Sequence, residues 1–148
     1  MRPPRRVIVE VSSTVRRMPL SAARTEKLVQ LTMDAEKIRD AMVSVAFVGV
    51  RAIAELNRKY LAHSGPTDVI SFGMGREKAS SPVVGDIYIC ADVAVRNAKR
   101  LKVSVRSELE RLVVHGSLHV TGRDHPDDET RTSSPMWRKQ EKILASSR

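Results

Sequence analysis

Residues 104–125 read SVRSELERLVVHGSLHVTGRDH, and this stretch indicates which helix lies at the centre of the fold. Apolar residues recur at helical spacing on one face: Leu109, Leu112, Val113, Gly116 and Val120. Two more apolar residues, Val114 and Leu118, lie on the opposite side. A helix that is apolar nearly all round is a buried helix. We therefore expect residues 104–121 to form a helix at the centre of the core. Gly122 ends it, because glycine readily takes the left-handed conformation found there.

The segments around this helix show strand and helix patterns in turn. Apolar and β-branched runs predict strands at residues 7–11, 42–48, 69–72 and 83–90. Helical spacing predicts helices at residues 21–38, 52–61 and 92–101, the last capped by Asp92, and a final helix that opens at Ser134-Pro135. About four strands and about five helices indicate an α+β fold with a small mixed sheet. We expect residues 1–148 to form one domain.

The composition narrows the classes of partner. The 148 residues include 26 Lys and Arg against 17 Asp and Glu, a net charge of +9, which favours a polyanionic partner such as nucleic acid. Only 3% of residues are aromatic, so we expect phosphate contacts to dominate. The single cysteine, Cys90, excludes an intramolecular disulfide and fits a reducing, cytoplasmic setting. No apolar run approaches the ~20 residues of a membrane span, so no membrane partner is expected.

Three of the four histidines lie within one short segment: His115, His119 and His125. Residues i and i+4 of a helix lie one above the other, and a turn at Gly122 lets His125 reach the same point. Three imidazoles can hold one Zn²⁺ and leave a fourth position open, as in catalytic rather than structural zinc sites. Metzincin proteases share this spacing but carry a glutamate general base after the first histidine, where this chain has Gly116.

The sequence resembles the YbeY family of bacterial single-strand metallo-endoribonucleases. The family signature His-Gly-x-Leu-His-x-x-Gly-x-Asp-His is matched at residues 115–125, and further motifs at Leu56-Asn57, residues 66–72, residues 85–87, Met136 and residues 141–144. The resemblance covers residues 46–148. It implies an α+β fold, one zinc per chain on the three histidines, and hydrolysis of single-stranded RNA. It also implies a role in ribosomal RNA maturation, at the small-subunit 3′ end, and in ribosome quality control.

The expected chemistry is metal-assisted phosphodiester cleavage. We favour in-line attack by a metal-activated water, with attack by the RNA's own 2′-OH as the alternative. Ribosomal RNA, the ribosome or assembly factors are the expected partners, and DNA is not expected. Two alternative functions are also compatible with the sequence: a zinc peptidase, and a non-catalytic, zinc-containing ribosome-assembly or RNA-binding factor.

Further candidate residues have two interpretations each. Asp124 either orients an imidazole or accepts a proton from the water, or else it caps the loop. Asp86, unusual in an apolar strand, either supports the metal site or bonds to loop backbone. Many family members carry an arginine implicated in activity at the position of Leu61; either Arg58 or Lys59 substitutes for it, or the phosphate contact is made differently. The remaining basic candidates either contact RNA phosphates or form a solvated face: Arg96, Lys99, Arg100 and Lys102.

Overall fold

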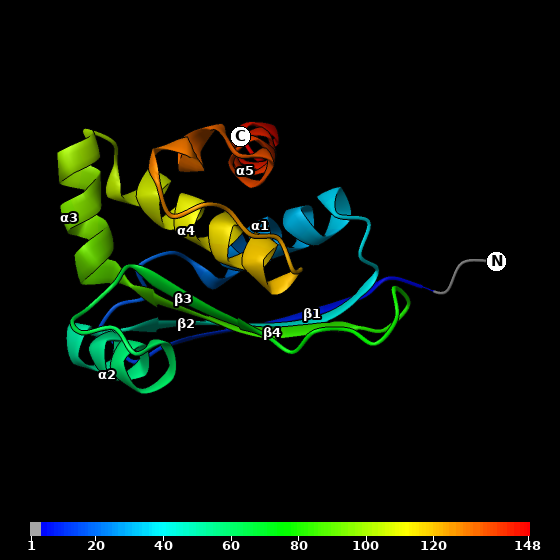
Figure 1. Cartoon of the computed structure of the whole chain (residues 1–148), viewed down its shortest axis with the longest axis horizontal. Helices are drawn as coiled ribbons and strands as arrows, with labels where there is room; N and C mark the ends of the chain where they lie inside the picture. The colour runs from blue at the N-terminus through cyan, green and yellow to red at the C-terminus, as the bar shows by residue number, and fades with distance from the viewer. Residues whose placement is uncertain (1–3) are drawn as a thin grey trace.

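The structure is a computed structural model that describes residues 4–148. In this range the chain forms four strands, five α-helices and one 3-10 helix (Figure 1). In chain order these are β1 (Arg6–Ser13), α1 (Ala22–Ala35), β2 (Asp40–Val48), α2 (Val50–Leu61), β3 (Val69–Gly73), β4 (Val83–Cys90), α3 (Ala91–Leu101), α4 (Val105–Val120), η1 (Glu129–Ser133) and α5 (Pro135–Ser146). None of these helices is long and apolar enough to cross a membrane.

The four strands form one mixed sheet in the order β1-β2-β4-β3. Strand β2 pairs in parallel with both β1 and β4, whereas β3 pairs antiparallel with β4. Parallel neighbours need a crossover connection, and α1 supplies one between β1 and β2. The expected α+β class, with a small mixed sheet of four strands and five helices, is confirmed.

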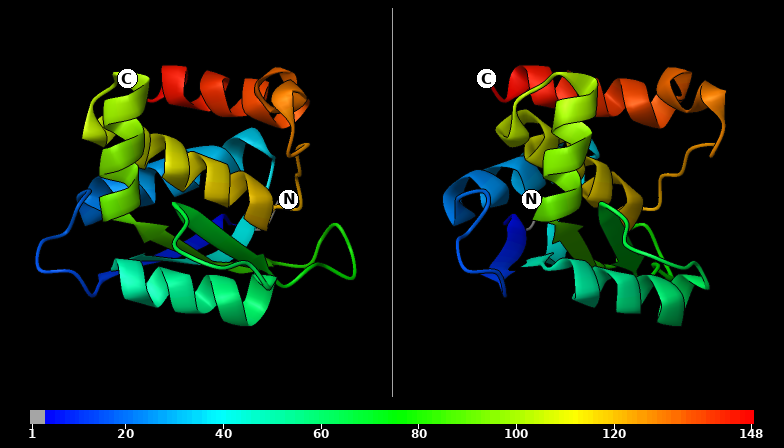
Figure 2. Two further views of the ribbon diagram at one scale, coloured as in Figure 1. Left: turned by 60° about the vertical axis from the view of Figure 1, so that its left-hand side comes forward. Right: turned by 90° about the vertical axis from the view of Figure 1, so that its left-hand side faces the viewer.

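The two faces of the sheet carry different layers. Helices α1 and α4 pack on one face with α5 beyond them, and α2 lies on the other face (Figures 1 and 2). The alternation of a strand decides which side chains meet which layer. In β4, Gly85 and Ile87 are buried on the α4 side, so Asp86 between them lies on the opposite face.

Helix α4 lies at the centre of the fold, as predicted from a sequence that is apolar nearly all round the helix. The Ser104 side chain caps it by accepting a hydrogen bond from the Ser107 N–H at 3.0 Å. Every residue from 112 to 118 is buried. Gly116 allows close approach to the sheet, because a Cβ there would stand 2.7 Å from Ile87 Cγ2. Beyond the helix, Gly122 takes a φ of 105°, which turns the chain back towards α4.

Two local expectations need correction, and one element was not predicted. Helix α1 ends at Ala35 rather than at residue 38, because Lys37 adopts a positive φ of 58° and turns the chain. The N-cap position of α3 is Cys90, whose side chain makes no capping bond, and Asp92 lies in the first turn. There its charge interacts favourably with the positive end of the helix dipole. The short helix η1 was not expected from the sequence.

Candidate metal centre

The three clustered histidines converge on one point. Helix α4 carries His115 and His119 one turn apart, and the chain after Gly122 brings His125 back to them. All three pairs of Nε2 atoms are separated by 3.2 Å. Ligand nitrogens bound tetrahedrally at ~2.0–2.1 Å from a metal ion lie ~3.3 Å apart. The three Nε2 atoms are therefore spaced as three ligands of one tetrahedral metal ion would be, and such an ion would keep a fourth position for a water or a substrate oxygen.

The other ring nitrogen of each imidazole faces an oxygen acceptor. His115 Nδ1 lies 2.7 Å from Gln140 Oε1, and His119 Nδ1 lies 3.0 Å from the Arg123 carbonyl oxygen. His125 Nδ1 lies 2.9 Å from the Pro126 carbonyl oxygen. Since these oxygens can only accept, each Nδ1 carries the proton and each Nε2 presents a lone pair. Three lone pairs directed at one point fit a cation there.

Burial favours the neutral form of the two ligands on α4. Burial lowers the pKa of His115 to about 3, although the Gln140 hydrogen bond opposes this, and the positive charges of the other two histidines and of Arg131 lower it further. Burial also lowers the pKa of His119, followed by the charge of His125 and, more weakly, of Arg131. Neutral imidazoles are the form that binds metal ions. Together the residues can hold one metal ion.

Gln140 belongs to this site, although it was not among the residues predicted from the sequence. It is completely buried in α5, where it follows Met136 and precedes Ile143 on the buried face of the helix. A glutamine at a core position of an amphipathic helix was the available signal, because a buried amide needs hydrogen-bond partners. Its partner lies 25 residues away on α4, and local sequence patterns do not identify such a pair.

The structure places the two candidate aspartates differently. Asp124 is exposed, and its Oδ1 accepts a hydrogen bond from the His125 N–H at 2.9 Å. It thus caps the loop, and the orienting role falls to other acceptors because all three Nδ1 atoms already have one. Asp86 is exposed on the opposite face of the sheet, where Ser44 Oγ donates to its Oδ1 at 2.5 Å. Because side chains alternate along β4, Asp86 lies on the face away from the metal ligands. The expected support of the metal site by Asp86 is therefore not seen.

The basic candidates divide between the two faces. Arg58 and Lys59 lie on α2, on the face away from α4, where Arg58 pairs with Glu55 and Lys59 Nζ lies 5.3 Å from the centre of the Tyr60 ring. Leu61 ends the same helix and is partly exposed. The four basic candidates at α3 are all exposed: Arg96, Lys99, Arg100 and Lys102. Of these, Arg100 lines a cavity beside α4.

Fold and site together define a class of protein. It is an α+β protein whose three-histidine group could hold a metal ion and leave one coordination position open. The family model for endoribonuclease YbeY matches residues 10–148. The endoribonucleases YbeY of Geobacter sulfurreducens and Geobacter metallireducens are 34% and 36% identical over 140 residues, which is 93% of this chain and 93% of each relative. That of Aquifex aeolicus is 39% identical over 100 residues, 68% of this chain and 67% of the relative.

A solved structure agrees with these relatives. The solution structure of a protein from Thermotoga maritima is similar with a TM-score of 0.63 and 26% sequence identity, covering 95% of this chain and 89% of that one. The chain belongs to the endoribonuclease YbeY family. It is therefore an enzyme of the hydrolase class that acts on RNA phosphodiester bonds.

Proposed function

We propose that this chain is a zinc-dependent, single-strand-specific endoribonuclease. It acts in ribosomal RNA maturation, at the 3′ end of the small-subunit RNA, and in ribosome quality control. The observation that carries the metal dependence is the triangle of His115, His119 and His125 Nε2 atoms, each with its lone pair directed inward. The assignment to ribosomal RNA rests on family membership.

Zinc is the metal that suits this donor set best. Imidazole nitrogens at tetrahedral spacing, with no carboxylate among the three ligands, are typical of zinc with an exchangeable fourth position. When bound, zinc supplies Lewis acidity and lowers the pKa of a coordinated water to about 7. The three neutral ligands leave the ion its full charge, which favours an anionic phosphodiester. Gln140, with the Arg123 and Pro126 carbonyls, holds the imidazoles in the tautomer that binds metal.

The charge of the chain supports an RNA partner. A net charge of +9 attracts a polyanion, and RNA in the cytoplasm, with the ribosome or its assembly factors nearby, is the expected setting. Residues 1–148 act as one metallo-endoribonuclease domain. In support, residues from Val7 to Leu144 contribute to one main hydrophobic core, and a second, smaller cluster includes Ile53 of α2.

The peptidase alternative is disfavoured by packing. A metzincin-type general base would stand at Gly116, where a Cβ already meets Ile87 Cγ2 at 2.7 Å and Ser71 Oγ at 3.0 Å. The non-catalytic alternative is disfavoured by the ligand count, because structural zinc sites use four protein ligands and this cluster offers three within the described residues.

The test combines metal analysis with cleavage. Purified wild-type protein should contain about one zinc per chain and cut a single-stranded RNA, leaving a duplex RNA and a single-stranded DNA intact. His115→Ala should lose metal and cut at background rate while binding the RNA within a few-fold of wild type. His63→Ala removes an exposed histidine outside the cluster and should behave as wild type. Undiminished cleavage by metal-free His115→Ala would overturn the proposal.

A further inference from the structure

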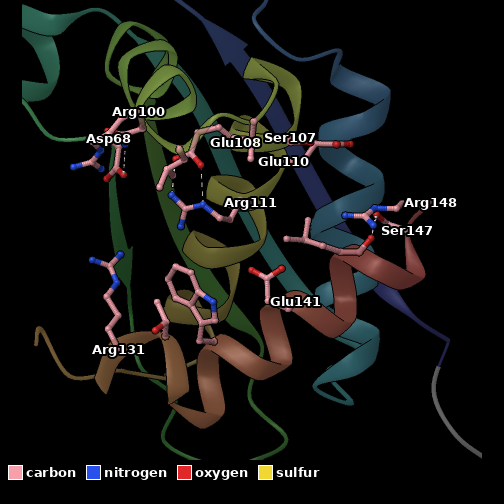
Figure 3. A pocket seen from close by; sticks show the side chains of 16 residues that line it. Asp68, Arg100, Ser107, Glu108, Glu110, Arg111, Arg131, Glu141, Ser147 and Arg148 are labelled. Atoms are coloured by element: carbon pink, nitrogen blue, oxygen red, sulfur yellow. Dashed lines mark hydrogen bonds and ion pairs between the residues drawn. The ribbon is translucent and has the colours of Figure 1, made fainter. Parts of the chain in front are cut away.

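A cavity borders the metal centre on the side formed by α3, α4, η1 and α5. It has a volume of about 490 Å³, within the range of small-ligand sites. Figure 3 shows Arg131 reaching from η1 towards Asp68, with Arg111 and Glu108 side by side on α4. Trp137 of α5 also lines the cavity, and its ring centre lies 6.2 Å from that of the metal ligand His115. Trp137 thus lines the cavity and packs against a metal ligand, whereas the three histidines themselves do not line the cavity.

The carboxylates that line this cavity already have partners. Glu108 accepts two hydrogen bonds from Arg111, at 2.8 and 2.5 Å. Glu110 accepts from Arg24 Nε at 2.5 Å. Asp68 accepts from Asn97 Nδ2 at 3.1 Å and from the Val69 N–H at 2.8 Å, and Glu141 accepts from Gln140 Nε2 at 3.3 Å.

Arg131 is different from these groups. Within residues 4–148, its Nε is buried and has no hydrogen-bond partner, and no carboxylate lies within 4.0 Å of its guanidinium. A buried donor that lacks a partner is costly, so its presence calls for an acceptor that arrives from outside. The guanidinium carbon of Arg131 lies 5.6 Å from the centre of the Trp137 ring, and that ring centre lies 6.2 Å from the ring centre of His115, so Trp137 links the guanidinium to the metal centre. An anion with several acceptor oxygens fits this position.

Trp137 supplies the second element of a nucleotide site. It is the only tryptophan of the chain, and it is half-buried at the cavity wall. The guanidinium carbons of Arg111 and Arg131 lie 5.4 and 5.6 Å from the centre of its ring. Aromatic rings and guanidinium planes are the groups on which proteins stack unpaired bases, whereas paired bases are not accessible to them.

We propose that this cavity is a subsite for one nucleotide of the single-stranded substrate, next to the cleaved bond, with the phosphate on Arg131 and the base stacked on Trp137. This inference rests on the proposed endoribonuclease function. It adds a physical basis for preferring single strands, because the base must leave any helix to reach the indole. Arg131 and Trp137 bind and position the RNA, and the metal ligands remain those already described.

The single tryptophan gives a direct readout. Zinc-loaded protein is titrated with a fluorescently labelled 2′-O-methyl hexaribonucleotide, whose integrity is checked on a gel after each titration. Anisotropy of the label measures binding, and tryptophan emission, recorded with the unlabelled hexamer, measures stacking. We expect saturable quenching of Trp137. Trp137→Leu should weaken binding by about 5- to 150-fold, as for loss of one base stack. Trp137→Phe should retain most of the affinity.

The phosphate contact has its own control. Arg131→Gln should weaken binding and reduce the slope of log affinity against log salt by about 0.7, the value for one phosphate on a single strand. Arg138→Gln removes the same charge from an exposed neighbour of Trp137 that does not line the cavity, and should leave slope and affinity near wild type. Zinc content and thermal midpoint, measured for each variant, separate lost contacts from lost folding.

The failures of the two proposals are distinguishable. If the hexamer binds with normal salt dependence while tryptophan emission stays constant, and if Arg131→Gln matches Arg138→Gln, the subsite is wrong and the endoribonuclease proposal stands. If wild-type protein neither binds nor cuts single-stranded RNA, the proposed function itself fails.

Discussion

Gln140 Oε1 lies 2.7 Å from His115 Nδ1, so that α5 holds a ligand carried by α4 in its metal-binding tautomer. The final helix of the chain is therefore part of the metal centre, although it supplies no ligand. The amide nitrogen of Gln140 is also held, because Nε2 donates one hydrogen bond to Glu141 Oε1 at 3.3 Å, which helps to orient the amide.

Removing this acceptor should weaken the metal site without removing a ligand. We expect Gln140→Met to lower zinc affinity by about 10- to 100-fold, because the imidazole loses the partner that fixes its orientation. Competition with a chromophoric chelator measures the affinity. Gln30→Met, on α1, makes a matched control outside the site and should leave it unchanged. Equal affinity in Gln140→Met and wild type would contradict the role of Gln140.

The metal should depend on all three histidines. His119→Ala should lose most of the zinc, and a variant with alanine at residues 115, 119 and 125 should retain none, because two imidazoles or fewer cannot complete the site. Elemental analysis after gel filtration measures the stoichiometry, with His63→Ala as the control. Stoichiometric zinc in the triple variant would place the metal elsewhere.

The metal-free protein should lose stability in mild acid. Burial lowers the pKa of His115 from 6.5 to about 3, and that of His119 is also lowered, so between these values the unfolded chain binds more protons than the folded one. Stability contributed by the neutral imidazoles is thus present above pH 6.5 and is lost as the pH falls towards 3. Urea midpoints in EDTA at several pH values measure this loss. His115→Gln should flatten the dependence, and parallel curves for the two proteins would argue against it.

Helix α4 should tolerate no side chain at Gly116. We expect Gly116→Ala to lower the free energy of unfolding by about 1–3 kcal/mol, because its Cβ would overlap Ile87 Cγ2. Gly49→Ala is the control, since nothing lies within 4 Å of a Cβ there. Gly116→Glu should destabilise further and create no proteolysis, as measured by denaturation and a casein assay. Peptidase activity in that variant would support the alternative hypothesis that the site is that of a metzincin-type peptidase.

Binding to single-stranded RNA should weaken steeply with salt. The charge of +9 and the few aromatic residues imply a grip dominated by phosphates, with a log–log slope of about −0.7 for each phosphate contacted. Anisotropy titrations from low to physiological ionic strength measure the slope. An affinity that does not change across this range would rule out a phosphate-dominated grip.

The parts of this protein that the sequence predicts are local. Residues 115–125 form a buried helix and one turn, so the spacing of three histidines and one glycine was enough to predict their convergence. The four strands and five helices followed from periodicity for the same reason, because an apolar pattern over 5–16 residues indicates which face meets the core.

The remainder depended on contacts between distant segments. The orientation of Asp86 away from the metal centre follows from which face of β4 meets α4, and a strand pattern alone does not identify that face. Gln140 and Trp137 reach His115 only because α5 packs on α4, 25 residues further along the chain in the case of Gln140. Local propensity specifies elements and short-range clusters, whereas the partners of a buried polar group are decided by how whole helices and strands pack together.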